Sequence, residues 1–168
     1  NDYDYSEVNF INFKLTPKVI IRDKVLNTKH EVNAWRLYNN NSKCVGENVI
    51  DKTDYFLKKL KLAGHFNENI DYSKVKVIGV HHKVKLIDKK LNTVHLLKPS
   101  ALLGRNTTLQ ISNAVDKTKY FLSLAKSKNR LREDQDYSNL KYVDSKTPIE
   151  IICKKHNTVH LFNPNTFL

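Results

Sequence analysis

Cysteine, glycine and proline are scarce in this chain of 168 residues. Its two cysteines, Cys44 and Cys153, occupy non-equivalent places in the repeat described below. They are a poor basis for a disulfide framework and favour a reducing compartment. Four glycines and four prolines are too few for a linker or a low-complexity chain. With 40% apolar residues, the chain can form a packed core.

Long apolar runs are also missing. None approaches the roughly 18 residues of a membrane span, and the start carries no signal peptide. We therefore expect no membrane partner and an intracellular, non-secreted location, in the cytoplasm or nucleoid of a host or within a nucleoprotein particle. The chain begins with Asn1 rather than Met. Together with the phase of the repeat, this predicts a part of a longer protein.

Positive charge is abundant. Lys and Arg number 29 against 17 Asp and Glu, which gives a net charge of +12. Such an excess costs self-repulsion, and its usual partner is a polyphosphate backbone, which releases condensed counterions when Lys and Arg replace them. An anionic membrane surface is the rival partner, and a merely solvated, Lys-rich surface is the plainest alternative.

The chain matches itself at an interval of 65 residues, which is the strongest pattern in the sequence. The triplet Asp-Tyr-Ser also occurs three times, at intervals of 67 and 65 residues. The matching elements are Asn27-Thr28, Asn92-Thr93 and Asn157-Thr158; His30, His95 and His160; Asp51-Lys52-Thr53 and Asp116-Lys117-Thr118; and Pro99 and Pro164. Duplication followed by divergence explains these coincidences.

Three tandem copies follow from this spacing. We assign residues 1–50 to copy one, which lacks its N-terminal helix, residues 51–115 to copy two, and residues 116–168 to copy three, which lacks its tail. In copy two, Asp51 or Thr53 can cap a helix that runs to about Ala63, with Gly64 as a stop signal. Its apolar stripe comprises Phe56, Leu57, Leu60 and Ala63. Copy three offers Phe121, Leu122 and Ala125 for the same role.

A hairpin is predicted after each Asp-Tyr-Ser, because two β-branched runs flank a turn with a central Asn. The strand pairs are 19–22 with 29–32, 84–88 with 93–96, and 149–152 with 159–162. We expect a third strand around residues 75–78 and a short helical turn near residues 99–103. The fold class is therefore α+β, with three tandem units of about 65 residues, each a helix plus a small antiparallel hairpin sheet.

The order of these elements resembles the small YDYS-type repeats of phage and bacterial proteins, which often accompany homing-endonuclease-type or other nuclease domains. The resemblance rests on Tyr3-Asp4-Tyr5-Ser6, Asp71-Tyr72-Ser73-Lys74-Val75 and Asp136-Tyr137-Ser138, and it runs over nearly the whole chain. It implies DNA binding, and a nuclease domain outside this segment. Two features depart from it: the hairpin turns lack His-Gly, and Gly104-Arg105-Asn106 stands where the repeats often have a cysteine-containing tail.

The three equivalent histidines invite a metal interpretation, but each copy supplies one repeated His and no repeated Cys. A zinc site needs about four converging ligands. We therefore expect no metal and no cofactor, and assign each imidazole a structural bond to the neighbouring turn backbone. The Asp-Tyr-Ser triplets are likewise predicted to be turns, in which Asp and Ser bond backbone N–H groups and Tyr packs on the hairpin. The alternative is a Tyr that stacks on a base.

Catalytic residues are not expected in this segment. Asp88-Lys89-Lys90 resembles the acid-x-Lys element of metal-dependent nucleases, but the matching residues in copy three are Cys153-Lys154-Lys155, without the acid. Asp88 also lies beside the predicted turn, where acids are ordinary. No Gly-rich phosphate loop is present.

The basic residues are the candidate nucleic-acid-binding site, because they recur on the helix and hairpin of the repeat and could follow a phosphate backbone. The candidates are Lys52, Lys58, Lys59, Lys61, Lys83, Lys85, Lys89, Lys90, Lys117, Lys119, Lys126, Lys128, Arg130 and Arg132. The stretch from Lys117 to Arg132 contains six cations and no acid. We expect Trp35 to pack between copies, with stacking on a base as the alternative.

Three functions compete. The leading one is a DNA-binding repeat region of a larger phage-type or mobile-element protein, with DNA favoured over RNA as the partner. The second is a structural protein of a large nucleoprotein particle, a ribosome or a virion, with other proteins as partners. The third is a nuclease in its own right, for which no complete catalytic set is present.

Overall fold

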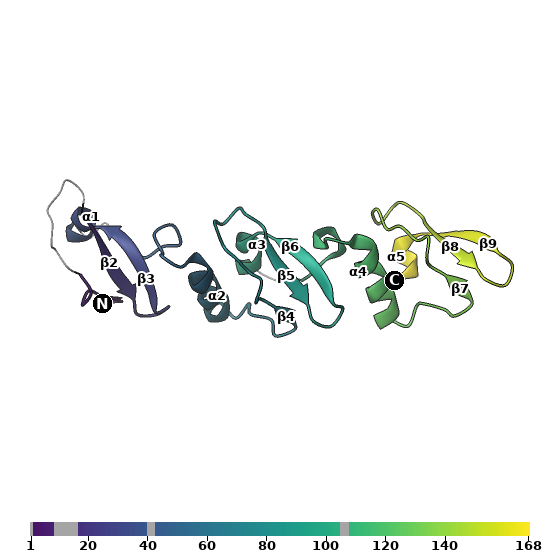
Figure 1. Ribbon diagram of the computed structural model, residues 1–168, viewed down its shortest axis with the longest axis horizontal. Helices are drawn as coiled ribbons and strands as arrows, with labels where there is room; N and C mark the ends of the chain where they lie inside the picture. The colour runs from purple at the N-terminus through teal and green to yellow at the C-terminus, as the bar shows by residue number, and fades with distance from the viewer. Residues whose placement is uncertain (1, 9–16, 40–42, 105–107) are drawn as a thin grey trace. The chain divides into compact units, whose positions relative to one another are not determined.

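The computed structural model describes residues 2–8, 17–39, 43–104 and 108–168. In these residues the protein is α+β, with three antiparallel three-stranded sheets and five α-helices (Figure 1). The chain divides into two compact units. The first comprises residues 1–66, 75–84 and 98–107, and the second comprises residues 67–74, 85–97 and 108–168.

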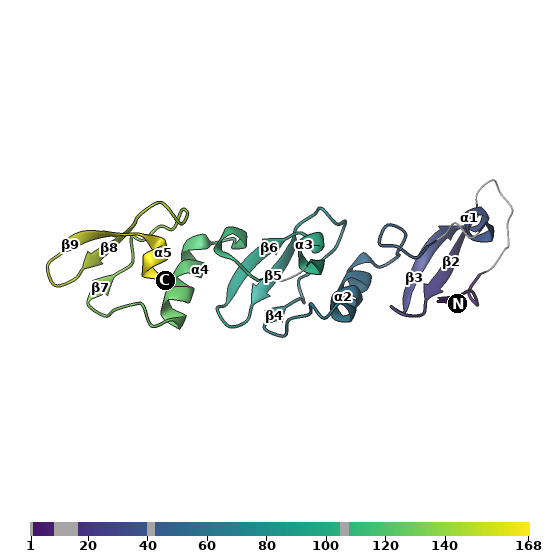
Figure 2. The same cartoon turned by 180° about the vertical axis from the view of Figure 1, so that it is seen from behind.

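Each sheet is a hairpin extended by one two-residue strand, and the strand order along the sheet follows the chain (Figure 2). The strands are β1 (Tyr3–Asp4), β2 (Lys18–Asp23) and β3 (Thr28–Asn33); β4 (Ile70–Asp71), β5 (Val84–Asp88) and β6 (Thr93–Leu97); and β7 (Gln135–Asp136), β8 (Ile149–Cys153) and β9 (Thr158–Phe162). In register, Ile21 faces His30 and Ile151 faces His160. The three predicted hairpins are thus confirmed.

The hairpin turns place Asn27, Asn92 and Asn157 in the left-handed region, with φ of 49°, 50° and 51°. Asn tolerates this conformation better than most residues. In the second turn, Asp88 Oδ1 accepts hydrogen bonds from the amides of Lys90 and Leu91 at 2.9 and 3.0 Å. Asp88 therefore stabilises a turn, as its position in the sequence suggested.

The prediction of a strand around residues 75–78 is wrong. The third strand of the second sheet is Ile70–Asp71, which pairs with the end of β5, and residues 75–78 are irregular. Val75 is buried, and the amide of Val77 donates to Thr53 Oγ1 at 3.0 Å. The backbone of this β-branched segment therefore bonds to the side chain of a residue in α2 and does not pair with a strand.

The longer helices are α2 (Lys52–Leu62) and α4 (Lys117–Ser127). Asp51 caps α2, since its Oδ1 accepts from the amides of Thr53 and Asp54 at 2.9 Å. The helix ends at Leu62 with Ala63 as its C-terminal cap, close to the predicted end, and Gly64 follows with a φ of +69°. The predicted stripe is correct for Phe56 and Leu60, which are buried; Ala63 is exposed, and Tyr55 is buried instead.

A short helix follows each hairpin: α1 (Ala34–Tyr38), α3 (Pro99–Leu103) and α5 (Pro164–Phe167). Only the second was predicted in full. Their first residues lie 65 residues apart. A 3₁₀ turn, η1 (Ile111–Asn113), precedes α4.

Separate apolar clusters form around the first and third sheets. The first contains Val19, Ile21, Val32 and Ala34, and the other contains Phe121 of α4 with Leu140, Ile149 and Ile151. The ring of Phe121 stacks on Tyr142 with centroids 4.9 Å apart. The second of these clusters includes Phe121 and so holds α4, the helix that carries Lys117, Lys119 and Lys126.

Candidate nucleic-acid interface

The acid-free stretch from Lys117 to Arg132, called the basic segment below, forms α4 and the loop after it. All six of its cations are exposed, and within the described residues none of them forms an ion pair. Lys119 and Lys126 lie two turns apart on the side of α4 opposite buried Phe121 and Ala125. They project charge from a helix whose other side is fixed in the core.

The loop part of the basic segment is held by hydrogen bonds through the side chain of Tyr137. The amide of Arg132 donates to the hydroxyl of Tyr137 at 2.8 Å, and Tyr137 donates to Gln135 Oε1 at 2.6 Å. Asn129 has a φ of 55°, which turns the chain after the helix. The guanidinium groups of Arg130 and Arg132 therefore project from a defined turn. Lys128 differs, because its Nζ donates to the carbonyl of Leu168 at 3.3 Å.

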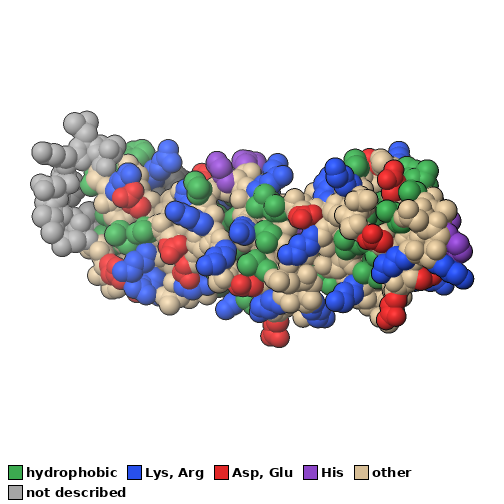
Figure 3. Space-filling model, turned by 45° about the vertical axis from the view of Figure 1, so that its right-hand side comes forward, with side chains coloured by type: hydrophobic (Ala, Val, Ile, Leu, Met, Phe, Trp, Pro, Cys, Tyr) green, Lys and Arg blue, Asp and Glu red, His purple; other side chains and the backbone are tan. Residues whose placement is uncertain are grey.

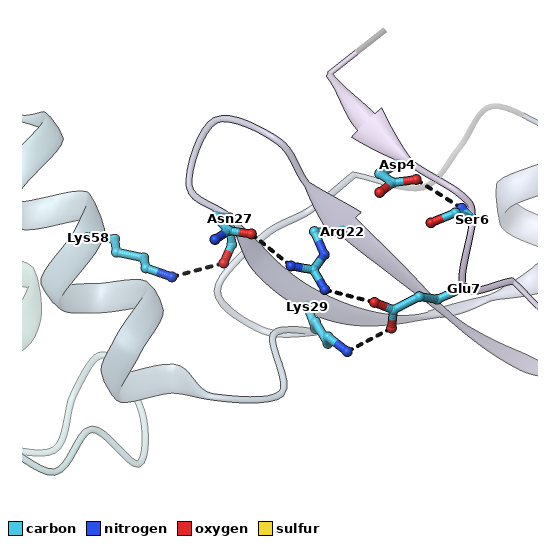
Figure 4. A network of polar contacts seen from close by, with 7 residues as sticks. All are labelled: Asp4, Ser6, Glu7, Arg22, Asn27, Lys29 and Lys58. Carbon is cyan, nitrogen blue, oxygen red and sulfur yellow. Dashed lines mark hydrogen bonds and ion pairs between the residues drawn. The ribbon is translucent and has the colours of Figure 1, made fainter.

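Two of the candidate lysines of α2, Lys52 and Lys58, are engaged within the protein. Lys58 Nζ lies 2.7 Å from Asp54 Oδ2. It also donates to the carbonyl of Asn27 at 2.9 Å (Figure 4). Lys52 Nζ donates to the carbonyl of Ile78 at 3.1 Å. Since these ammonium groups already have partners, a phosphate would have to compete for them.

Two further α2 lysines lie over aromatic rings. Lys59 Nζ is 5.3 Å from the centroid of Tyr55, and Lys61 Nζ is 5.1 Å from the centroid of Phe66. Such cation–π contacts at exposed sites are weak, about 0.5–1 kcal/mol. Lys59 and Lys61 therefore keep most of their capacity to bind an anion.

The candidates in the second hairpin are mixed. Lys83, Lys85 and Lys90 are exposed, and Lys85 alternates along β5 with buried Val84 and Leu86. Lys89 instead donates its ammonium proton to the carbonyl of Glu68 at 2.8 Å.

The candidate residues are divided between the two compact units. Lys52, Lys58, Lys59, Lys61 and Lys83 belong to the first unit, and the others belong to the second. Figure 3 shows basic side chains spread over the visible face with acidic ones between them. The basic segment stands out in the second unit because it combines six cations with no acid in its own sequence.

Sequence reasoning missed an ion network on the first sheet, shown in Figure 4. Glu7 lies between Arg22 and Lys29, at 2.8 and 2.7 Å, and these hydrogen bonds lower the pKa of Glu7, the bond from Lys29 most. Lys18 pairs with Glu31 at 2.6 Å. No local pattern shows these pairs, because each joins residues far apart in the sequence. Within the described residues, every ion pair belongs to the first compact unit.

Two aromatic residues of α1 are exposed. Trp35, which we expected to pack between copies, is 69% exposed, and Tyr38 is 86% exposed. They lie three residues apart on one helix, where side chains are neighbours. Arg36 is also exposed in this turn. The three side chains combine flat rings with a cation, which is the composition of a surface that stacks bases.

The Asp-Tyr-Ser triplets form turns, as predicted. The Asp carboxylates of positions 4, 71 and 136 accept the amide proton of the Ser two residues later at 2.8–2.9 Å. This backbone bond is the main reason that the pKa of each carboxyl is lowered. Tyr72 is buried and its hydroxyl accepts the amide of Asn67, so the triplet of the second sheet offers no free ring to a base.

The repeated histidines bond to a strand threonine. The predicted partner, the turn backbone, is incorrect, because Nε2 of His30, His95 and His160 lies 2.9, 3.1 and 3.0 Å from the Oγ1 of the Thr two residues earlier. Both residues face the same side of the strand. His95 is fully buried, and burial lowers its pKa, against opposing contributions from Asp88 and the backbone of Gln110.

A group of Asp23, His30 and Cys44 brings three ligand-type atoms within 4.8 Å of one another. The sequence did not indicate it, because position 109, the match of Cys44, is Leu. Nδ1 of His30 is engaged by Asn48 Oδ1 at 2.9 Å, so both ring nitrogens have partners. Burial, with a contribution from Asp23, raises the pKa of the Cys44 thiol to about 11. The group therefore fits a hydrogen-bonded core better than a metal site.

Arg105 and Asn106, which replace the tail of the resembling repeats, lie outside the described residues. None of the helices in the described ranges combines the length and apolar character needed to cross a bilayer.

Comparison with known proteins gives one distant relative to report. No family model matches the chain, and no solved structure matches it. It is 25% identical over 171 residues to an uncharacterized protein of Acanthamoeba polyphaga mimivirus. The match covers 99% of this chain but 61% of that protein, so the chain spans about three fifths of its relative's length.

Proposed function

We propose that this chain binds nucleic acid through the phosphate backbone, with DNA favoured over RNA, as a repeat region of a larger phage-type or mobile-element protein. The basic segment carries the proposal: six exposed cations, no acid and no ion pair within the described residues. Each cation that replaces condensed counterions on a polyphosphate adds to the affinity. Contacts of this kind position a protein on nucleic acid without reading its sequence.

The proposal includes three copies of one unit, each with a helix, a small antiparallel sheet and a short helix, except that copy one lacks the first helix. Contacts that recur 65 residues apart support it. Thr53 Oγ1 accepts the amide of Val77 at 3.0 Å, and Thr118 Oγ1 accepts the amide of Tyr142 at 2.9 Å. A repeated unit would repeat a weak binding site along one polyanion.

Exposed rings on α1, in the first compact unit, are a second proposed contact, considered apart from the basic segment. Trp35 and Tyr38 offer flat faces to unpaired bases, beside the guanidinium of Arg36. Base stacking on such rings tolerates any sequence. The rings of α1 thus suit a binder of low sequence specificity.

The test is a titration of labelled duplex DNA and of the matching RNA duplex between about 50 and 200 mM salt. The affinity should fall linearly on a logarithmic scale as salt rises. Replacing Lys119 and Lys126 by Gln should reduce the magnitude of this slope by about 2, since each phosphate contact contributes about 0.9.

A matched control is the replacement of Lys141 and Lys146 by Gln, which removes two exposed cations outside the basic segment. This variant should keep the wild-type slope. Affinity that does not change with salt, or equal losses in the two double variants, would contradict the proposed interface.

A further inference from the structure

The residue that ends the first strand of each hairpin differs in the third sheet. In the first two sheets it is Asp23 or Asp88, whose carboxylate accepts the amide protons of the residues two and three positions later at 2.8–3.0 Å. In the third sheet it is Cys153, at the end of β8. The turn that follows keeps its left-handed residue, Asn157. A thiol thus stands where the other two turns hold a negatively charged side chain.

An imidazole lies beside this thiol. Sγ of Cys153 is 3.5 Å from Nδ1 of His156, which is hydrogen-bond distance for sulfur. His156 is exposed, and Cys153 is partly exposed. The matching residues of the first two copies are Leu26 and Leu91, so the pair of thiol and imidazole belongs to the third copy alone. A base within reach of a thiol can take its proton and make the sulfur a nucleophile.

Two lysines stand between the members of the pair in the sequence. Lys154 Nζ donates to the carbonyl of Glu133 at 2.7 Å. Lys155 is exposed and forms no ion pair with any residue that the structure describes. Cations this close to the sulfur raise the local concentration of a negatively charged reactant.

The other cysteine of the chain has contrasting surroundings. Cys44 packs against the apolar cluster of the first sheet. Burial, with a contribution from Asp23, raises the pKa of its thiol to about 11, and both ring nitrogens of the nearby His30 already have partners. A thiol that stays protonated is a poor nucleophile. Cys44 therefore serves as an unreactive reference within the same chain.

We propose that Cys153 is a modification site that undergoes thiol–disulfide exchange with a small anionic disulfide, with His156 as its base. Nδ1 of His156 takes the thiol proton as Sγ attacks one sulfur atom of the disulfide. The S–S bond of the reactant breaks, a new bond joins Sγ to the attacked sulfur, and the other half leaves as a thiolate that takes up the proton. Cys153 is thereby oxidised to a mixed disulfide, and the released half is reduced to a thiol.

This site is separate from the proposed nucleic-acid interface. Cys153, His156 and Lys155 lie outside the basic segment, in the third hairpin and its turn. The inference therefore stands or falls independently of nucleic-acid binding.

The experiment exposes the complete chain of 168 residues to glutathione disulfide and locates the adduct by mass spectrometry of the intact chain and of its peptides. We expect one glutathionyl group per chain, on Cys153, added at least about tenfold faster than at Cys44. His156→Gln should slow this modification at least about tenfold, because an amide does not take the proton. Since His156 is exposed, the variant should keep its fold, and its urea midpoint checks this.

The charge of the reactant is tested with a second probe, the neutral bis(hydroxyethyl) disulfide. Lys155→Gln should slow the reaction with glutathione disulfide and leave the rate with the neutral disulfide unchanged. His82→Gln, at another exposed position, is the matched control for His156→Gln and should keep the wild-type rate with both probes.

Four results would overturn the proposal. The first is modification of Cys44 as fast as that of Cys153, and the second is a wild-type rate in His156→Gln. The third is an equal change of both rates in Lys155→Gln, which would remove the preference for an anionic reactant. The fourth is a disulfide between Cys44 and Cys153 in place of the adduct.

Discussion

Tyr120 lies edge-on against the imidazole of His95, with ring centroids 4.6 Å apart. Its hydroxyl donates to the carbonyl of Leu109 at 2.9 Å. The side chain is 4% exposed, and burial is the main reason that its pKa is raised. One tyrosine therefore joins a helix, a strand and the loop that precedes the helix.

Replacing Tyr120 should separate these contributions. Tyr120→Phe removes one hydrogen bond and should cost about 1 kcal/mol of unfolding free energy. Tyr120→Ala also removes the ring and should cost about 3–5 kcal/mol. Urea denaturation measures both values. Tyr38→Ala, at an 86% exposed position, should change the stability by less than about 0.5 kcal/mol; equal effects at the two sites would contradict this account.

Stability should decrease on acidification because of His95. Burial holds the pKa of this ring below its ordinary value of 6.5. Between the folded and unfolded pKa values the unfolded chain binds more protons, so unfolding becomes more favourable as the pH falls below about 6.5. The contribution is fully present above the unfolded pKa and is lost as the pH drops through the folded pKa.

The measurement is the urea midpoint from about pH 7.5 to pH 5. His95→Gln should flatten the profile relative to the wild type, whatever its effect on absolute stability. His82→Gln, at an exposed position, should leave the profile unchanged. A stability difference between wild type and His95→Gln that is constant over this range would refute the assignment.

Asn157 should tolerate glycine but not valine. Its φ of 51° lies in the left-handed region, and its side chain is exposed. Asn157→Gly should be close to neutral, whereas Asn157→Val should cost about 1–2 kcal/mol, because a β-branched residue is strained there. Thermal unfolding checks the order of the two variants. Asn139→Val, in an exposed turn without positive φ, is the control and should cost less.

Trp35 should report nucleic-acid binding directly. It is the one tryptophan of the chain and is 69% exposed. If bases stack on it, single-stranded DNA should quench its emission, and Trp35→Ala should weaken binding by about 1–3 kcal/mol. Since the ring is exposed, the variant should keep its stability. Unchanged Trp35 emission at saturating DNA would show that this residue is not part of the binding surface.

The sequence predicted the elements whose determinants are local. Asn92 marks its turn because it accepts a positive φ, and Asp51 marks a helix start because its carboxylate satisfies free amides of the first turn. The two-residue strands were not predictable in the same way. Ile70–Asp71 is a strand only because the end of β5 pairs with it, and two residues carry no periodicity.

The residue types of the candidate site could be predicted from the sequence, but the bonding partners of each lysine could not. Lys58 and Lys119 look alike in the sequence, yet Lys58 is paired with Asp54 and bonded to Asn27, whereas Lys119 forms no ion pair with any residue that the structure describes. The bond to Asn27 joins residues 31 positions apart. The acid-free run from Lys117 was the informative signal, because a cation without acidic neighbours in its own helix has fewer ways to be neutralised.

Adjacent residues of α4 contact different sheets. Tyr120 packs on His95 of the second sheet, and Phe121 packs in the cluster of Ile149 and Ile151 on the third. Melting the third sheet would remove the support from one side of the helix that holds the second. We therefore expect amide hydrogen exchange in α4 and in β6 to follow one common opening event, so that the two sheets share their cooperativity through a single turn of helix.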